Sequence, residues 1–350
     1  MSSPPAVDVC IVNYFGADEV RGALRTLGGW PHGTIWLVDN SVDPAQAAAL
    51  REHRGAELLL PGDNLGFGRG CNLAFERSRA EFFLLLNPDA RITARDLLAL
   101  AETMRREPRV AALSPRIYWN RPRSFVLPAA FAQTPAMTLA QNLAPRSHRL
   151  TLDAVERYLA RQRRMMAAPG STRVDFLAGA VLLLRREAIG DAGGLFDPDY
   201  FMFYEDSDLS LRLRRRGWQL AVTGAADAVH EYRHKAFKGA LMAQAREVYF
   251  RKRYPRFHRH LKRVDALARP VPLQDWFDVL REPCASLEAF ERQTNGAAVA
   301  AFSPSPLMMP AIFRPGAAAP FTRDEWDLLE PAGYAVKFEG RARWTWFERT

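Results

Sequence analysis

Strand-like and helix-like segments alternate through the first third of the chain. Short apolar runs, the first of them rich in β-branched residues, predict strands at 7–12, 34–38, 57–60 and 82–86. Helical spacing of apolar residues predicts helices between them, at 17–28, 44–54, 68–79 and 94–106. This alternation predicts an α/β fold, in which helices cover both faces of a mainly parallel central sheet.

Polar residues follow three of these predicted strands directly. Asn13 comes after the first strand, Asp39-Asn40 after the second and Asn87-Pro88-Asp89 after the fourth. In a parallel sheet, ligands bind beyond the carboxyl ends of the strands, where the loops gather. We therefore expect these side chains to form part of a binding site.

The remaining pattern of the 350-residue sequence predicts a helical tail and a small appendage after the α/β domain. Prolines interrupt the alternation at 119–173. Within this segment the sequence predicts a basic amphipathic helix at 155–164, and after it a strand at 174–184. The predicted divisions are an α/β domain at 1–239, a basic helical tail at 240–270 and a small α+β appendage at 271–350. The tryptophan clusters of the appendage fit either a core or a carbohydrate or partner surface. Packing on the catalytic domain, dimerisation and acceptor contact are all open roles for it.

The charge is carried mainly by arginine. Lys and Arg number 48 against 39 Asp and Glu, a net charge of +9, and only five of the cations are Lys. Arginine suits phosphates, because its guanidinium binds them with two hydrogen bonds, and it suits an anionic membrane surface. A solvated surface is the alternative. We expect no nucleic-acid partner.

The location of the chain is predicted from what the sequence lacks. No apolar run reaches the roughly 18 to 20 residues that span a bilayer. The first residues have neither the basic nor the apolar region of a signal peptide. Three scattered cysteines suit neither a disulfide framework nor a zinc cluster. We expect a cytoplasmic protein, with peripheral contact at the inner face of the cytoplasmic membrane through the basic segments.

A knot of carboxylates is the main candidate for catalysis. Glu205, Asp206 and Asp208 lie within four residues, directly after an aromatic and apolar stretch. Neighbouring carboxylates repel one another, and an apolar setting raises the pKa of a carboxyl, which suits a general base. The alternative is that they only complement the dipole of a helix that begins there.

Three further features point to a phosphate-bearing ligand and a metal. The carboxylate and amide oxygens of Asn87 and Asp89 suit a divalent cation, although Asn-Pro-Asp is also a common turn. Glycines open a predicted helix between Asn64 and Asn72, as at phosphate sites, although they also suit a bare turn. His230 ends a predicted strand and is a structural histidine or a ligand.

Together these segments resemble glycosyltransferase family 2, the inverting enzymes with a GT-A fold that use nucleotide-diphosphate sugars. The resemblance covers roughly residues 7–235. It rests on Val12-Asn13-Tyr14, Val38-Asp39-Asn40-Ser41, Asn64 to Asn72, Leu86-Asn87-Pro88-Asp89, Phe176 to Ala180, and Phe196-Asp197 through Glu205-Asp206-Ser207-Asp208 to Gly217-Trp218. The chain is most similar to the rhamnosyltransferase-like branch, whose members build bacterial cell-surface polysaccharides.

The resemblance implies a nucleotide site on the first half of the sheet. Asp39 would hold the nucleobase, with Asn13 beside it. Asn64 and Arg69 would lie in the loop that closes over the nucleotide. Gly179 would lie on a strand that approaches the donor sugar and the acceptor.

The resemblance also implies a metal site for Mg²⁺ or Mn²⁺. Asp89 would be the metal-binding carboxylate, and His230 would complete the site. Asn87 stands where the family's D-x-D motif has its first aspartate, which removes one anionic ligand. The basic residues at 233–235 would clamp the diphosphate or form a solvated turn.

The catalytic roles implied by the resemblance fall on the carboxylate knot. Asp206 would be the general base, and Glu205 and Asp208 would shape the acceptor pocket. The expected reaction moves rhamnose from a dTDP donor, or a hexose from a UDP donor, to a hydroxyl of a glycan or a lipid-linked acceptor. A nucleotidyltransferase would need a glycine-rich basic loop after the first strand, where Asn13-Tyr14-Phe15-Gly16 stands instead. A non-catalytic binding protein of the same fold is the other alternative.

Overall fold

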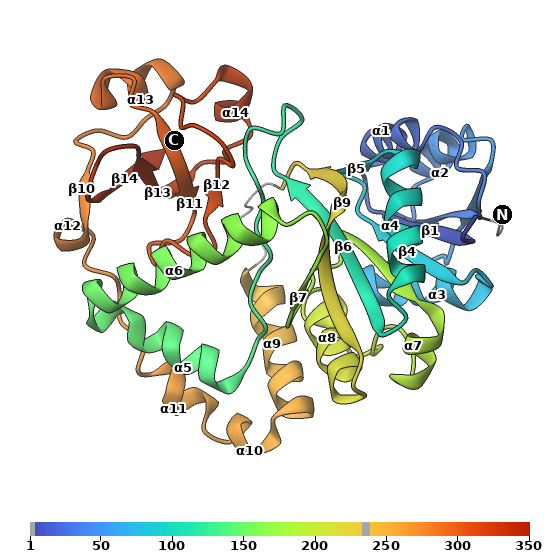
Figure 1. The fold of residues 1–350 in the computed structure, drawn as a ribbon. Coiled ribbons are helices and arrows are strands. Elements are labelled where there is room, and N and C mark those ends of the chain that lie inside the picture. Colours follow the sequence, from blue (N-terminus) through green and yellow to red (C-terminus); the bar gives the residue numbers. More distant parts are fainter. Residues whose placement is uncertain (1–3, 233–238) are drawn as a thin grey trace.

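The computed structural model describes residues 4–232 and 239–350 and contains two β-sheets (Figure 1). The larger sheet has nine strands, with the order β3-β2-β1-β4-β8-β6-β9-β5 and with β7 paired to β9. Its first four strands are parallel and have these bounds: β1 Val7–Asn13, β2 Ile35–Asp39, β3 Ala56–Leu59 and β4 Phe82–Leu86. The predicted strands of the first third are therefore confirmed.

The second half of the large sheet is mixed. Its strands are β5 Ala90–Ile92, β6 Val110–Tyr118, β7 Ser171–Val174, β8 Val181–Arg185 and β9 Gln219–His230. Strand β8 runs antiparallel to both β4 and β6, whereas β6 and β9 are parallel. Strands β5 and β7 both pair antiparallel with β9. The parallel half is thus the part that gathers several strand ends at one edge.

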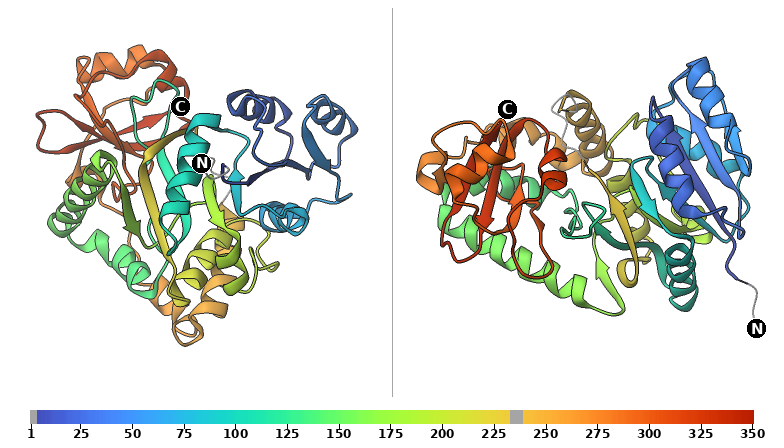
Figure 2. Two further views of the ribbon diagram at one scale, coloured as in Figure 1. Left: turned by 45° about the vertical axis from the view of Figure 1, so that its right-hand side comes forward. Right: turned by 90° about the horizontal axis from the view of Figure 1, so that it is seen from above.

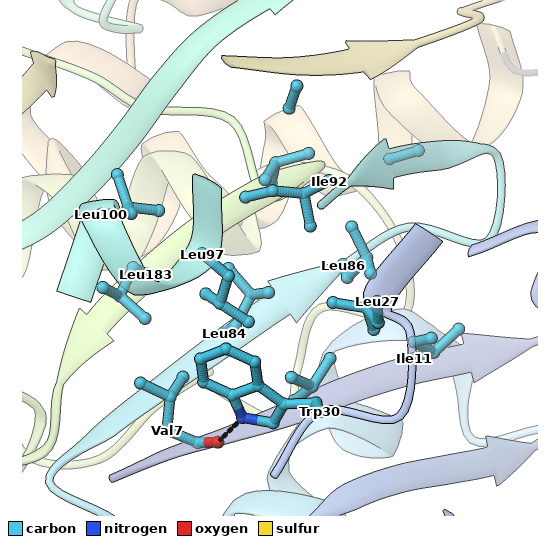
Figure 3. Close-up of a cluster of buried hydrophobic side chains, with 14 of the residues drawn as sticks. Val7, Ile11, Leu27, Trp30, Leu84, Leu86, Ile92, Leu97, Leu100 and Leu183 are labelled. Carbon is cyan, nitrogen blue, oxygen red and sulfur yellow. Dashed lines mark hydrogen bonds between the residues drawn. The ribbon is translucent and has the colours of Figure 1, made fainter. Parts of the chain in front are cut away.

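Helices cover both faces of this sheet, as the alternation predicts. On one face lie α1 Ala17–Leu27, α2 Pro44–Arg51 and α4 Ala94–Arg106, whose leucines pack with β1 and β4 (Figure 3). In this core the Trp30 indole donates a hydrogen bond to the Val7 carbonyl. On the other face lie α3 Gly66–Arg77, α7 Arg186–Asp191 and α8 Glu205–Arg215.

The single strand predicted at 174–184 is confirmed only at its ends, in β7 and β8, and is wrong at 175–180. Residues 175–180 leave the sheet and separate β7 from β8, so Gly179 lies in a turn and not on a strand. Its N–H points to the Asp206 carboxylate at 3.4 Å, and a Cβ at this position would contact the Phe67 ring. Gly179 thus donates a hydrogen bond to the Asp206 side chain and lies against the Phe67 ring, instead of pairing with a neighbouring strand.

Two further groups of helices extend the domain. The first is α5 Pro135–Leu143, a 3₁₀ turn at Ala144–Arg146 and α6 His148–Ala167, which confirms the predicted basic amphipathic helix. The second group forms the basic tail, with α9 Gly239–Arg253, α10 Pro255–His258 and α11 Leu261–Asp265. No helix in the described residues is both long and apolar enough to cross a bilayer.

The C-terminal segment is α+β, as predicted. Its sheet has the order β10-β14-β13-β11-β12, with β10 Phe277–Val279, β11 Val299–Ser303, β12 Ile312–Phe313, β13 Ala332–Phe338 and β14 Trp344–Arg349. Its helices are α12 Leu273–Trp276, α13 Leu287–Thr294 and α14 Arg323–Asp327. The tryptophan clusters are buried, so they form a core and not a carbohydrate surface.

The appendage shares its core with the first domain. Trp119 and Phe125, from the segment after β6, pack against Phe302 of β11. Val126 forms β-bridges with both Tyr118 of β6 and Phe313 of β12. The appendage therefore lies against the far end of the large sheet, opposite the parallel half (Figure 2).

Candidate functional site

Two polar side chains join the carboxyl ends of β1 and β2. The Asn13 amide donates a hydrogen bond of 2.9 Å to Asp39 Oδ1, and both residues are buried. The backbone N–H of Ser41 donates to the same oxygen at 3.1 Å. The two residues predicted to meet at this edge do meet, and the bonds hold the Asp39 carboxylate in a fixed orientation.

Exposed apolar side chains surround this pair, and the sequence reasoning missed them. Tyr14 and Phe15 follow Asn13 and make an edge-to-face contact with ring centroids 4.9 Å apart. Val42, after β2, is exposed as well, and both Phe15 and Val42 have positive φ. Strained, solvent-facing apolar residues beside a buried carboxylate are typical of a ligand site. Aromatic residues directly after a buried strand were the available signal.

The glycine turn that opens α3 joins the sheet edge at Asn13 and Asp39 to the loop before α8. Asn40 donates from its side chain to the Gly66 carbonyl at 2.9 Å, and the Phe67 N–H donates to the Phe201 carbonyl at 3.0 Å. A Cβ on Gly66, which has φ of 75°, would overlap that same carbonyl. Glycine is thus required here by both conformation and close approach.

The two predicted nucleotide-loop residues are exposed at this turn. Asn64 accepts a hydrogen bond of 3.0 Å from the Gly66 N–H through its side-chain oxygen. Arg69 donates from Nε to the Pro198 carbonyl at 3.1 Å. Both therefore support the contact between the glycine turn and the loop before α8.

The Asn87-Pro88-Asp89 turn meets His230 across the β5–β9 pair. Strand register places Ala90 opposite His230, and His230 Nε2 lies 3.2 Å from Asp89 Oδ1. The imidazole is buried, whereas Asp89 is open to solvent. Within the described ranges, no three His, Cys, Asp or Glu side chains come together as a metal cluster. The structure thus brings together the two side chains that the sequence predicts as metal ligands.

Arg91, which the sequence reasoning missed, holds this turn in place. Its guanidinium donates to the Pro88 carbonyl at 2.6 Å and pairs with Glu19 of α1 at 2.5 Å. A Cβ on Gly22 of α1 would overlap the guanidinium. Gly22 therefore makes the space in which Arg91 ties the turn to α1.

Asp206 lies at the start of α8, behind a strained loop. Phe203 and Tyr204, just before the helix, both have positive φ. Asp206 accepts a hydrogen bond of 2.7 Å from the Ser207 N–H and a longer one from the Gly179 N–H. Burial raises the pKa of Asp206 to about 6, although these hydrogen bonds lower it in part. A carboxylate with this pKa is ionised at neutral pH and still basic enough to accept a proton.

Glu205 is the more deeply buried carboxyl of the pair. Burial, followed by repulsion from Asp206, raises the pKa of Glu205 to about 8. Its Oε2 is buried and has no hydrogen-bond partner. Glu205 is therefore neutral at pH 7, which leaves Asp206 to carry the negative charge of the pair.

Asp208 lies in the interior, where cations surround it. Its carboxylate pairs with Arg212 at 2.7 Å and with Arg253 of α9, and the Tyr200 hydroxyl donates to it at 3.3 Å. The side chain is fully buried. In this setting Asp208 ties α8 to α9 and to the loop that precedes Asp206.

Continuous contacts connect the predicted base, Asp206, to the turn predicted to bind a metal. Asp206 bonds Gly179, and the carbonyl of the next residue, Ala180, accepts a hydrogen bond of 2.8 Å from the Asn87 N–H. Asn87 is two residues before Asp89. The base and the predicted metal turn thus share one edge of the sheet. The basic residues predicted as a diphosphate clamp, at 233–235, lie outside the described residues.

Comparisons with known proteins identify relatives of this arrangement. The family model described as "Glycosyltransferase like family 2" matches residues 118–249. The N-acetylglucosaminyl-diphospho-decaprenol L-rhamnosyltransferase of Mycobacterium tuberculosis is 32% identical over 219 residues, which cover 57% of this chain and 67% of that protein. Rhamnosyltransferase WbbL of Escherichia coli is 23% identical over 282 residues, which cover 75% of this chain and 100% of WbbL.

A solved structure supports the fold. GalNAc-T7, crystallised with UDP, GalNAc and Mn²⁺, matches with a TM-score of 0.50 and 11% identity, over 71% of this chain and 48% of that one. At this identity the likeness concerns the arrangement of the elements alone.

Proposed function

Since the chain belongs to glycosyltransferase family 2 and is thus a sugar transferase, we propose that it moves rhamnose from a dTDP donor with inversion. A UDP-hexose is the second candidate donor. The proposed acceptor is a hydroxyl of a lipid-linked saccharide. The two rhamnosyltransferases support the sugar, and the printed name of the Mycobacterium tuberculosis relative supports the acceptor class.

The observation that carries the proposal is the shared edge of the sheet. It brings together a fixed carboxylate at Asp39, the candidate metal ligands Asp89 and His230, and a carboxyl of raised pKa at Asp206, our proposed base. A nucleotide-sugar transferase needs these three functions in one place: recognition of the nucleotide, neutralisation of its diphosphate and removal of a proton.

The proposed reaction is a single displacement. The acceptor hydroxyl oxygen forms a bond to the anomeric carbon while the bond from that carbon to the diphosphate breaks. The proton of the hydroxyl passes to an oxygen of Asp206, and the nucleoside diphosphate leaves with the bonding electrons. Because attack and departure occur on opposite faces of the sugar, the configuration inverts. Glu205, neutral at pH 7, keeps a second negative charge away from the base.

The donor set at Asp89 and His230 fits Mg²⁺ or Mn²⁺. Their donor atoms are 3.2 Å apart, close to the separation of about 3 Å between adjacent ligands of one such ion. A carboxylate oxygen suits both ions, whereas the imidazole nitrogen suits the transition metal Mn²⁺ better, and diphosphate oxygens would complete the shell. Such an ion would stabilise the charge that develops on the leaving diphosphate. We propose Asn87, Asn64, Arg69 and Gly179 as further contacts of the donor, and Asp208 as a positioning residue.

The test combines nucleotide binding with transfer. A ligand at about 100 times its Kd stabilises the native state by about 2.7 kcal/mol, which gives a readable thermal shift. We expect dTDP with Mn²⁺ to give the largest shift among dTDP, UDP, GDP and CDP. We expect Asp206→Asn to keep that shift and to lose at least about 100-fold in transfer to a polyprenyl-diphosphate N-acetylglucosamine.

Three outcomes would contradict parts of the proposal. Full transfer by Asp206→Asn would remove the base assignment. A shift with UDP alone would replace the donor. A shift with dTDP but no transfer by the wild-type chain to any saccharide acceptor would favour the non-catalytic binding protein.

A further inference from the structure

Exposed apolar and basic side chains occur together on α5, at the start of α6 and on α11, near the loop that precedes α8. Leucines that face solvent mark this area: Leu139 and Leu143 on α5 are 39% and 38% exposed, Leu150 on α6 is 67% exposed, and Leu267 after α11 is 37% exposed. Ala136 and Ala140 extend the stripe on α5 at helical spacing and are exposed too. We name this the α5–α11 surface.

The elements of this surface are held together. The Asn142 side chain, on α5, donates to the Val264 carbonyl at 3.0 Å and to Asp265 at 3.3 Å, both on α11. Helix α6 follows α5 after a single 3₁₀ turn, and the views of Figures 1 and 2 agree that α5, α11 and the start of α6 adjoin. The exposed leucines therefore lie on neighbouring elements.

The charge around these leucines is basic. Arg146 and Arg149 flank Leu150, and Lys262 and Arg263 lie on α11, all exposed. The sequence has no Asp or Glu at 135–152 or at 256–264. The acids next to these ranges are Asp153, exposed on α6 three residues after Leu150, and Asp265. Asp265 is engaged by Arg246 at 2.8 Å, which with its hydrogen bond lowers the pKa of Asp265.

We propose that the α5–α11 surface docks on a bilayer that contains anionic lipid. Exposed leucines among arginines and lysines match the two layers of a membrane interface, with apolar side chains at the acyl boundary and cations at the headgroups. A second copy of the chain fits less well, because a two-fold contact would bring the same cations together. An acidic protein partner would satisfy the charge but does not call for four exposed leucines.

The position of the surface gives it a use. On the inner side of the tail helices, Tyr249 of α9 and Leu261 of α11 pack in one cluster with Tyr200 and the aromatic residues just before Glu205. Docking would thus hold the Asp206 end of the site close to the membrane, where a lipid-linked hydroxyl is found. This last step rests on the proposed function, whereas the docking itself does not.

Vesicle flotation of the full chain tests the docking without any substrate. We expect the wild-type chain to float with phosphatidylcholine vesicles that contain about a third phosphatidylglycerol, and not with phosphatidylcholine alone. Leu139→Ser/Leu143→Ser/Leu150→Ser should lower the bound fraction at least about tenfold, since its apolar contact is lost. Arg146→Glu/Arg149→Glu/Lys262→Glu should lower it similarly.

A matched control separates this surface from net charge. Arg51→Glu/Arg54→Glu/Arg77→Glu makes the same change in charge at exposed residues in the parallel half, and we expect it to float as the wild type does. Equal loss in this control, or full flotation of the leucine variant, would overturn the proposal. Wild-type chain that does not float but forms dimers lost in the leucine variant would assign the surface to a second copy. The dTDP shift of every variant should stay unchanged, so failure of docking and failure of the proposed function can be told apart.

Discussion

At the scale of single residues, the neighbouring carboxyls Glu205 and Asp206 divide the work of the site between them. Both are largely removed from water, but Asp206 accepts hydrogen bonds from the backbone N–H groups of Ser207 and Gly179, whereas Oε2 of Glu205 has no partner. Those bonds favour its charged form, so Asp206 ionises first and Glu205 must then ionise next to a negative charge. Position in the turn, rather than residue type, decides which carboxyl ionises first and is therefore proposed as the base.

The neutral Glu205 predicts a pH-dependent stability. Its pKa of about 8 in the native state lies above the ordinary value of 4.5, so the native state binds this proton more tightly than the unfolded state does. The contribution of this proton to the free energy of unfolding is therefore lost progressively as pH rises from about 4.5 to about 8. Glu205→Gln removes this loss, and we expect it to exceed the wild type in unfolding free energy at pH 8 by on the order of 3 kcal/mol, and by little at pH 5.

Urea denaturation at both pH values measures this difference. Glu102→Gln, at an exposed position on α4, is the matched control and should follow the wild type at both. The transfer rate should still decline below about pH 6 in Glu205→Gln, because Asp206 sets that limb. A variant that tracks the wild type from pH 5 to pH 8 would show that Glu205 is ionised in the native state.

At the scale of elements, α1 and the turn before β5 are coupled through one guanidinium. Gly22 would ordinarily cost α1 about 1 kcal/mol relative to alanine. Here the missing Cβ leaves room for Arg91, which holds the Pro88 carbonyl and Glu19 together. Gly22, a poor helix former in α1, thus makes room for the contacts that hold the turn containing Asp89.

A double-mutant cycle tests this coupling. We expect Gly22→Ala alone to lower the unfolding free energy by about 1 to 3 kcal/mol, because the new methyl group displaces the guanidinium. In an Arg91→Ala background the same change should raise stability by up to about 1 kcal/mol, the ordinary gain of alanine in a helix. Either Gly22→Ala or Arg91→Ala should also weaken the Mn²⁺-dependent nucleotide shift.

Gly190→Ala is the control for this cycle. Gly190 lies in α7 with open space around its Cβ position, so the change should behave alike in both backgrounds. Additive effects of Gly22→Ala and Arg91→Ala would mean that the guanidinium does not depend on that space.

The elements that the sequence predicts well are those specified by local pattern. The strands of the parallel half are short apolar runs, and their ends place Asn13, Asp39 and Asp89 at one edge by topology alone. The break between β7 and β8 is different, because it depends on the Asp206 carboxylate, 27 residues after Gly179. Arg91 is likewise visible only once α1 is placed beside β5. What escaped prediction was determined by long-range contacts.

At the scale of the whole molecule, a buried ion pair ties the appendage to the catalytic sheet. Arg314 donates two hydrogen bonds to Glu325, of 3.1 and 2.8 Å, and both side chains are buried. The same carboxylate accepts from Ser124 and from Asn120, on the segment that leaves β6. The sequence suggested a boundary near residue 270, whereas the shared core and the hydrogen bonds from Asn120 and Ser124 to Glu325 cross that boundary.

This joint predicts that the two parts unfold together. Glu325→Ala leaves the Arg314 guanidinium buried without its charge partner, which costs about 3 to 5 kcal/mol. Because residues 119–126 belong to both cores, we expect a single transition in guanidinium for the wild type, and one at lower denaturant for the variant, with dTDP and Mn²⁺ shifting both. Glu288→Ala, which breaks the exposed pair with Arg323 on the same appendage, should leave the midpoint unchanged. Two separate transitions, of which only one responds to the nucleotide, would instead show that residues 271–350 fold as an independent domain.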